Sequence, residues 1–388
     1  MLQRTLGVPI FQEQVMRLSM VAAGFTSGEA DQLRRSMAAW KRRGGLEKFQ
    51  HKLKQGMHKR GYNHQFAEQI CSQIQGFGEY GFPESHSASF ALLAYVSAWL
   101  KRHHPAEFTC ALLNSLPMGF YAPAQLVQDA VRHGVEVLPV DIRYSAVDSI
   151  VHVPSVIRLG LRRVKGLSGS GMERIVKARE HKPFADVQDL AGRAALNRRD
   201  LECLASADAL YGLSGHRYRA FWSVSGVEKP MPLLPSLQFA EGEPLLQRPA
   251  EGENIVADYG HVGLSLRRHP VALLRKRLNR DRIYPAQALW ALRSGTTAST
   301  AGLVINRQRP ASASGVIFLT LEDETGYVNV VVWPGTAENQ RQPLLCSKLL
   351  AVTGQVQQED GVLHLVAGRL RDLSGWLGKL STSSRDFH

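Results

Sequence analysis

Several features that define common classes of protein are missing from this sequence of 388 residues. Its four cysteines are far apart and form no Cys-x-x-Cys pair, which argues against a disulfide framework or a cysteine-based zinc site and favours a reducing compartment. The most apolar stretch, residues 88–100, is too short for a membrane span of about 20 residues, and the N-terminus has no apolar signal region. We therefore expect a cytoplasmic protein with no membrane partner.

Motifs for catalysis and metal binding are also missing. No two aspartates lie two positions apart, so the sequence has no Asp-x-Asp pair of the kind that holds divalent metals. It contains no Walker loop, Gly-x-Ser-x-Gly or His-Glu-x-x-His motif. The acidic run Glu322-Asp323-Glu324 is expected to be solvated at the end of a hairpin. We predict no catalytic residue, no metal ligand and no cofactor bound by this chain.

Positive charge is what the sequence has in excess, with a formal net charge of +13 and arginine outnumbering lysine 34 to 13. An arginine bias favours bidentate contacts with phosphate. The excess lies in three blocks, net +7 over residues 1–104, +6 over 155–230 and +6 over 255–300, whereas residues 301–388 are neutral. Acidic connectors separate these blocks, which favours several modules on one polyanion over solvated helix faces alone.

Helical patterns dominate the first 225 residues. A capping box at Thr26–Glu29 predicts a helix that ends near Arg43. Further helices are expected over 62–75, 85–100, from 105, 121–133 and 156–211, with a short strand at 135–140. The helix from Ser85 to Leu100 is apolar on nearly all sides, so we expect it to be buried. Five prolines within residues 228–254 predict an extended linker.

From residue 300 the hydrophobic period changes to two, which predicts strands. Five strands with a short helix between the third and fourth are typical of an OB-fold; they are expected at 300–306, 315–322, 327–333, 348–357 and 362–370. Phe318, Tyr327 and Trp333 face away from the aliphatic side, where they suit stacking on single-stranded DNA unless a loop or domain covers them. The predicted class is multidomain, mainly α, followed by a small β-barrel.

Two helical segments present groups suited to a phosphate chain. Arg34 and Arg35 are adjacent near the middle of a helix and flanked by small residues, so they form either a bidentate clamp or a basic surface stripe. Ser85 and His86 lie at a helix N-terminus. There they either bind an anion, or the serine only caps the helix and the histidine ring packs against the protein.

Residues 164–171 have the spacing of a helix-hairpin-helix, between helices predicted at 156–165 and 171–180. Glycines there let backbone N–H groups point at a DNA phosphate without reading sequence; the alternative is a plain helical hairpin. A second helical pair has basic residues near its turn. The predicted DNA-binding residues are Arg162, Arg163, Lys165, Gly166, Gly169, Gly171, Arg198 and Arg199.

In this order, the Arg34–Arg35 helix, the turn at 81–90, the hairpin and the OB-fold resemble the C-terminal half of bacterial family C DNA polymerases, the DNA polymerase III alpha type. Runs typical of the error-prone branch lie at 5–14, 81–108, 263–270, 316–334 and 384–388. The resemblance implies that Arg34, Arg35, Ser85 and His86 contact the triphosphate of an incoming dNTP. It also implies that the hairpin domain binds primer–template duplex and that the OB-fold lies near single-stranded template.

The same resemblance implies five segments. They are a partial fingers domain with connector (1–152), a helix-hairpin-helix DNA-binding domain (153–228), a Pro-rich linker and basic helical connector (229–297), the OB-fold (298–374) and a tail (375–388). The family's catalytic aspartates lie in a palm domain that would precede residue 1, and Mg²⁺ is expected in that full enzyme. The chain alone is then an inactive part of a DNA-directed DNA polymerase, a nucleotidyltransferase serving DNA replication, repair of DNA damage and translesion synthesis.

The sequence departs from replicative members at Pro83-Glu84, where they have Asn-Lys, and it has no sliding-clamp peptide. A polymerase-like adaptor would then recruit it and connect it to the sliding clamp. Two alternatives stay open: a stand-alone, non-enzymatic DNA-binding accessory protein, and an RNA-binding OB protein.

Overall fold

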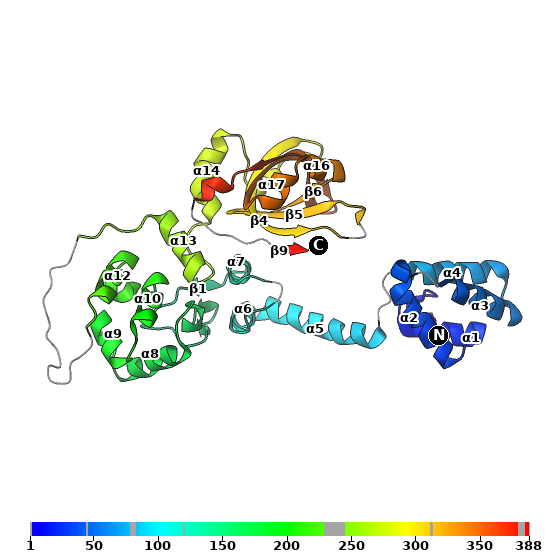
Figure 1. The fold of residues 1–388 in the computed structure, drawn as a ribbon, viewed down its shortest axis with the longest axis horizontal. Helices are drawn as coiled ribbons and strands as arrows, with labels where there is room; N and C mark the ends of the chain where they lie inside the picture. The colour runs from blue at the N-terminus through cyan, green and yellow to red at the C-terminus, as the bar shows by residue number, and fades with distance from the viewer. Residues whose placement is uncertain are drawn as a thin grey trace. The chain divides into compact units, whose positions relative to one another are not determined.

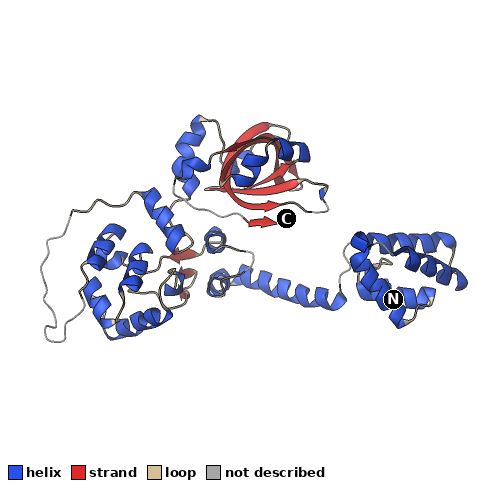
Figure 2. Cartoon of the chain, viewed as in Figure 1, coloured by secondary structure: helices blue, strands red, loops and turns tan. Residues whose placement is uncertain are grey.

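The computed structural model describes residues 2–43, 46–77, 83–118, 121–228, 245–310, 313–378 and 385–387, in two compact units, 1–104 and 105–388 (Figure 1). The first unit is helical, and the second adds a small sheet and a β-barrel to its helices (Figure 2). The predicted class, mainly α followed by a β-barrel, is confirmed. No helix in the described residues has the length and hydropathy needed to cross a membrane.

The first unit packs four helices around an aliphatic core that includes Val15, Leu33, Met57 and Ile70. Its elements are η1 (Gln3–Thr5), α1 (Gln12–Ala23), α2 (Ser27–Arg43), α3 (Leu46–Lys59), α4 (His64–Phe77) and α5 (Glu84–His103). The predicted capping box opens α2, because the Thr26 N–H donates to Glu29 at 3.0 Å and the Glu29 N–H donates to Thr26 Oγ1 at 3.3 Å.

Helix α5 contradicts the prediction that it is buried. None of its residues is buried, and the side chains of Leu93, Tyr95 and Trp99 are 58%, 71% and 46% exposed. An all-round apolar pattern shows that a helix favours burial, but burial also needs a neighbouring element to cover it. The described residues of the first unit do not cover α5.

The second unit opens with two helices and a three-stranded sheet in the order β1-β3-β2. The elements are α6 (Pro105–Asn114), α7 (Pro123–Arg132), β1 (Glu136–Leu138), β2 (Ile150–Val153) and β3 (Val156–Arg158). The helix predicted over 156–165 is wrong, because Val156 and Ile157 pair with β1 and β2. Their β-branched side chains favour a strand, and only η2 (Leu161–Arg163) turns helically before the hairpin.

The described residues that follow, up to residue 261, are mainly helical. Their helices are α8 (Gly169–His181), α9 (Val187–Arg193), α10 (Arg198–Ser206), α11 (Tyr211–Ser214), α12 (Arg217–Ser225) and α13 (Glu251–His261). A single core runs from Ala106 to Leu264 and joins these helices to α6, α7 and the small sheet; we call this part, residues 105–264, the helical core. Of the predicted linker, residues 229–244 lie outside the described residues, and α13 begins within its last part.

The barrel has strand order β5-β6-β8-β7-β4 and closes by pairing of β5 with β4. Its elements are β4 (Thr297–Gln308), β5 (Ile317–Asp323), β6 (Gly326–Val332), α16 (Pro334–Asn339), α17 (Arg341–Cys346), β7 (Leu349–Glu359) and β8 (Val362–Asp372), followed by η4 (Ser374–Leu377) and β9 (Arg385–Phe387), which pairs with β4. All five predicted strands and the helical insertion are present. Leu319, Leu321, Val328 and Val330 point into the core, as the period-two pattern predicted.

Two helices, α14 (Pro270–Arg280) and α15 (Ala286–Leu289), are held on the barrel by the acidic run that was expected to be solvated. Asp323 is only 3% exposed; its Oδ2 accepts hydrogen bonds from Arg275 Nη2 at 3.0 Å and from the Ala286 N–H at 2.7 Å. Glu324 also pairs with Arg275. The prediction of a solvated run is therefore wrong, because these carboxylates pair with the partly buried Arg275 and accept a hydrogen bond from the N-terminus of α15.

Candidate nucleic-acid interface

Arg34 and Arg35 lie side by side on α2 and share one carboxylate. Arg34 Nε donates to Asp31 Oδ1 at 2.9 Å, and Arg35 Nη2 lies 2.8 Å from Asp31 Oδ2. The Arg34 hydrogen bond and the Arg35 charge lower the pKa of Asp31, so this carboxylate is ionised at neutral pH. The Arg35 side chain remains 74% exposed and can reach an anion, and Asp31 orients both guanidiniums. Their nucleotide-binding role stays a prediction.

Ser85 and His86 are exposed in the first turn of α5, after Pro83 as the N-cap. The Glu84 N–H donates to the Glu13 carboxylate at 2.9 Å, so a side chain from α1 already supplies negative charge to this helix end. The His86 ring packs against the Phe90 ring, with centroids 4.4 Å apart. Ser85 and His86 therefore stay predicted nucleotide contacts, at a helix N-terminus that has an internal anion.

The hairpin turn before α8 has the backbone shape that its glycines predicted. Gly166 has φ +84°, and Ser168 caps α8 by accepting from the Gly171 N–H at 3.0 Å. Asp200, only 1% exposed, accepts from the Ser168 N–H and hydroxyl, both at 2.9 Å. These hydrogen bonds join the turn to the second helical pair, and the exposed first residues of α8, Gly169 and Ser170, leave its N-terminus accessible to an anion.

Two of the three predicted glycine contacts, Gly169 and Gly171, differ in their surroundings. A Cβ at Gly171 would lie 2.7 Å from Ser168 Oγ and 3.0 Å from Asp200 Oδ2, so this glycine is required by the packing of the turn. A Cβ at Gly169 would meet nothing within 4 Å. Gly169 is therefore the position where closeness to an external group can be tested without disturbing the fold.

The basic residues beside the turn are partly committed to internal contacts. Arg163 Nη2 donates to the Val262 carbonyl at 3.0 Å, and burial lowers the pKa of Arg163. Lys165 Nζ donates to the Gly260 carbonyl at 3.0 Å, at the end of α13. Arg162 pairs with Asp148 at 2.5 Å, but its side chain is 57% exposed. These contacts fix α13 beside the hairpin and leave Arg162 the more accessible cation.

The second helical pair repeats the capped turn. Asn197 caps α10, with its Oδ1 accepting from the Asp200 N–H at 2.8 Å. Arg198 and Arg199 follow in an exposed first turn, and Arg198 Nε donates to Glu202 at 2.9 Å. Asp200 was not assigned a role from the sequence; the available signal was an acidic residue three positions after an N-cap residue. It links the two hairpins.

The three aromatic side chains predicted to stack on bases have different surroundings on the barrel. Phe318 and Trp333 are 36% and 55% exposed. Tyr327 is covered, because Arg132 of α7 lies 4.3 Å from its ring centroid and its hydroxyl donates to Gln128 at 3.4 Å. Tyr327 therefore follows the alternative prediction, in which a neighbouring element covers the ring. Phe318 and Trp333 remain accessible for stacking.

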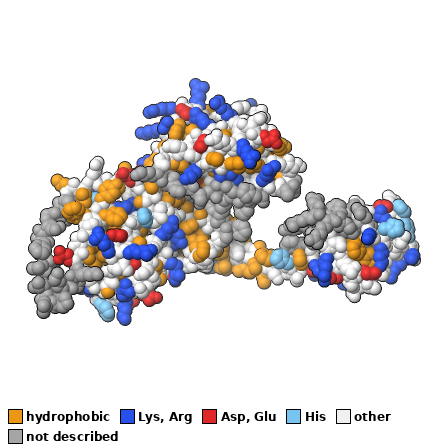
Figure 3. Space-filling model, in the orientation of Figure 1, with side chains coloured by type: hydrophobic (Ala, Val, Ile, Leu, Met, Phe, Trp, Pro, Cys, Tyr) orange, Lys and Arg blue, Asp and Glu red, His pale blue; other side chains and the backbone are white. Residues whose placement is uncertain are grey.

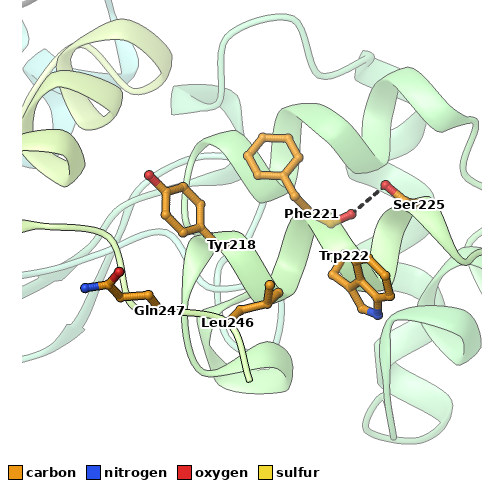
Figure 4. Close-up of a pocket in the computed structure, with 6 residues that line it drawn as sticks. All are labelled: Tyr218, Phe221, Trp222, Ser225, Leu246 and Gln247. Atoms are coloured by element: carbon orange, nitrogen blue, oxygen red, sulfur yellow. Dashed lines mark hydrogen bonds between the residues drawn. The ribbon is translucent and has the colours of Figure 1, made fainter. Parts of the chain in front are cut away.

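An apolar pocket of about 360 Å³ lies on α12, where Tyr218, Phe221 and Trp222 form its wall and Leu246 closes one side (Figure 4). Spacings of three and four residues place these aromatics on one face of the helix. No charged side chain lines the pocket. It therefore suits an apolar group and not a phosphate.

No group of three or more His, Cys, Asp or Glu side chains in the described ranges is arranged to hold a metal ion. The Mg²⁺ expected in a complete enzyme of the resembled family has no fitting ligand set among these residues, so no step is assigned through a metal here.

Three family models match separate parts of the chain. A bacterial DNA polymerase III alpha subunit finger domain matches residues 1–61, a helix-hairpin-helix motif matches 134–220, and an OB-fold nucleic acid binding domain matches 298–373. These ranges correspond to the α1–α3 region, the two capped hairpins with their small sheet, and the barrel.

Relatives named error-prone DNA polymerase align along the whole chain. The protein from Methylococcus capsulatus is 59% identical over 408 residues, covering 100% of this chain and 39% of its own length. The one from Alkalilimnicola ehrlichii is 61% identical over 391 residues, covering 100% and 38%. The chain thus spans less than two fifths of these relatives. The asparaginyl-tRNA synthetase of Pyrococcus horikoshii is similar over 21% of this chain and 20% of its own, with 23% identity and a TM-score of 0.19, too low to support an argument.

Proposed function

Because the chain belongs to the family of error-prone DNA polymerases of the DNA polymerase III alpha type, we propose that it forms the DNA-binding part of such an enzyme. The observation that carries the proposal is the hairpin turn, where Asp200 and Ser168 present an exposed α8 N-terminus to an anion. Such a site holds a backbone phosphate and reads no bases, as a polymerase that moves along its template requires. The barrel adds Phe318 and Trp333 for unpaired bases.

In the proposed enzyme the first unit contacts the incoming dNTP. Arg35, with Arg34 beside it, neutralises triphosphate charge, while Asp31 keeps both guanidiniums oriented. Ser85 and His86 are the further nucleotide contacts. The enzyme serves translesion synthesis in DNA repair in the cytoplasm, and an adaptor connects it to the sliding clamp. Bond formation belongs to paired aspartates and Mg²⁺ outside these 388 residues, so this chain alone binds DNA without extending a primer.

A primer-extension assay tests the division of labour. The purified chain, supplied with dNTPs, Mg²⁺ and a labelled primer–template, is expected to retard the DNA in a gel and leave the primer unextended. Template-dependent extension above the protein-free blank would contradict the proposal.

Gly169→Val tests the hairpin as a DNA contact. The added side chain meets open space in the structure, so folding is retained, but it blocks approach of a phosphate to the α8 N-terminus. We expect duplex affinity to fall about tenfold, irrespective of sequence. Gly192→Val in α9, where a Cβ also meets nothing within 4 Å, is the matched control. Equal affinity of the two variants would remove the hairpin from the DNA interface.

Arg34→Ala with Arg35→Ala tests the nucleotide site in a full-length enzyme. Loss of these charge-assisted contacts should raise the dNTP KM or lower kcat, with a combined loss of about tenfold or more, while DNA affinity is retained. Lys59→Ala, at the end of α3, is the control. A loss of DNA binding with unchanged dNTP kinetics would contradict the triphosphate role.

A further inference from the structure

A polar cleft of about 160 Å³ lies on the outside of the barrel, beside the end of α14. Its floor is built by strands β4, β7 and β8. In their register Ser299 lies opposite Thr353 and Thr353 opposite Arg369, while Ala351 lies opposite Arg371. Arg369 and Arg371 are two positions apart on β8, so both project outward, whereas Leu370 between them is 6% exposed and points into the barrel.

The groups in this cleft are those that bind a phosphate. Two guanidiniums and two hydroxyls line it together with the small Ala351, and Ser299 Oγ and Thr353 Oγ1 lie 2.7 Å apart. Guanidiniums offer paired N–H donors that match phosphate oxygens, and hydroxyls can donate to the same group. Among the described residues no carboxylate pairs with Arg369.

One carboxylate also lines the cleft. Asp281 Oδ2 lies 3.0 Å from Arg371 Nη2, and both side chains are well exposed, at 37% and 48%. Arg280 and Arg282 flank Asp281 in the chain and are exposed, as is Lys276 on α14. Figure 3 shows Lys and Arg side chains gathered where α14 lies in Figure 1. The surface around the cleft is therefore positive, although the barrel segment as a whole is neutral in charge.

We propose that this cleft binds a backbone phosphate of nucleic acid, with Arg369 and Arg371 as its charged donors. The contact is separate from the hairpin turn and from the aromatic side of the barrel, because Phe318 on β5 and Trp333 after β6 do not line it. It is independent of base sequence, since only phosphate chemistry is offered. The inference rests on the proposed function, which identifies the bound polyanion as DNA. It adds a second phosphate site to the DNA interface, besides the one at the hairpin turn.

Asp281 sets the strength of this contact. Its carboxylate holds Arg371 in the absence of a ligand, and a phosphate would compete with it for the same guanidinium. Removing the carboxylate charge should therefore strengthen DNA binding, whereas removing the two arginines should weaken it. Opposite effects from two neighbouring changes are not expected of general damage to the fold.

The test measures the affinity of the whole chain for a fluorescent primer–template with a single-stranded overhang, between 50 and 200 mM salt. We expect Arg369→Ser with Arg371→Ser to weaken binding about tenfold and to reduce the slope of log K against log salt by about 0.7–0.9, the value for one phosphate contact. Asp281→Asn should tighten binding about threefold. Arg293→Ser, which replaces an exposed arginine that does not line the cleft, is the control for the loss of a single surface charge.

The outcomes separate the two proposals. If the unmodified chain binds no DNA, the proposed function fails. If it binds but the double variant matches the Arg293→Ser control in affinity and slope, the cleft is not a phosphate contact. Inorganic phosphate, added at constant ionic strength, tests whether the cleft is instead a site for a free anion. If millimolar phosphate lowers the DNA affinity of the unmodified chain to that of the Arg369→Ser, Arg371→Ser variant, the assignment to nucleic acid is overturned. Unfolding midpoints of all variants should agree, because each change lies on the surface.

Discussion

Residues 155–230, within the helical core, and residues 255–300, which include α14, carry the same excess of positive charge but use their basic residues differently. Residues 155–230 and 255–300 each have a net charge of +6. In the helical core, arginine side chains donate to carbonyl groups inside the fold. Around the cleft they remain at the surface. A count of charges by segment therefore identifies which segments attract an anion overall. It does not identify which of their cations are free to contact that anion.

Three arginines illustrate the internal use. Arg179 Nη1 donates to the carbonyls of Ile142 and Ser145 at 2.7 and 3.0 Å, and burial lowers its pKa. Arg193 donates to the Lys182 carbonyl at 2.7 Å. Arg217, with its side chain 5% exposed, pairs with Asp258 at 2.7 Å. Each hydrogen bond of this charged kind contributes about 1.5–3 kcal/mol when its partners are well aligned, so these cations stabilise the scaffold and do not recruit DNA.

The largest expected effect on stability is that of Arg217→Ala, which removes an internal arginine of the helical core. Removing the guanidinium leaves the Asp258 carboxylate, 8% exposed as a residue, with less of its compensating charge. We expect the free energy of unfolding of the helical core to fall by about 3–5 kcal/mol, measured by urea unfolding followed by circular dichroism at the helix band. Arg369→Ser on the barrel surface is the comparison and should change stability by less than about 0.5 kcal/mol. Similar costs for both would show that the two regions use arginine alike.

The next test concerns the place where the two regions meet. Burial, with Glu322 of β5 and Asp258 nearby, raises the pKa of Tyr259 on α13 to about 12. In the unfolded chain this tyrosine ionises near its ordinary pKa of 10, so the folded state holds the extra proton between pH 10 and 12. Its contribution is fully present below pH 10 and is lost as the pH rises through 12, by about 2–3 kcal/mol.

Tyr259→Phe should remove that part of the alkaline loss. Unfolding of the two proteins is compared at pH 9.5 and 11.5, where lysines titrate alike in both, so the difference isolates Tyr259. Parallel losses of stability in the two proteins would show that the surroundings of Tyr259 do not raise its pKa in the folded state.

The smallest effect on stability is expected for Arg198→Ala, which changes an exposed cation of the helical core. Its pair with Glu202 spans one helical turn, and the two side chains are 72% and 48% exposed. Stability should fall by no more than about 0.5 kcal/mol, while duplex affinity falls about threefold if Arg198 reaches a phosphate. The same titration that measures Gly169→Val provides the readout, with Arg293→Ser as the control. A stability loss without a change in affinity would place Arg198 with the internal cations.

Much of the fold could be predicted from local patterns. The capping box at Thr26 and the alternating valines of β6 each depend on neighbours in sequence, and both are present as expected. Asp360 and Gly361, a pair typical of tight hairpin turns, join β7 to β8 with φ values of +48° and +76°. Strand β3 was missed because two β-branched residues are too short a signal beside a helical pattern.

Features that depend on distant partners could not be predicted. The exposure of α5 and the covering of Tyr327 by α7 are set by which elements come together. Asp323 was expected in water because its partner, Arg275, is 48 positions away in the sequence. The cleft was missed for the same reason, since its arginines and hydroxyls come from three strands. The DNA-binding role of the predicted basic residues stays a prediction, and their internal contacts are visible only in three dimensions.

The most direct test of the account is the equilibrium binding of this chain to a labelled primer–template, by fluorescence anisotropy, between 50 and 200 mM salt. The account predicts tight binding at the lower salt and a loss of about a thousandfold at the higher, as expected for six or more phosphate contacts. It also predicts equal affinity for unrelated sequences, because the hairpin and the cleft offer donors to phosphate alone. An absence of binding at 50 mM salt, or an affinity that does not change with salt, would contradict it.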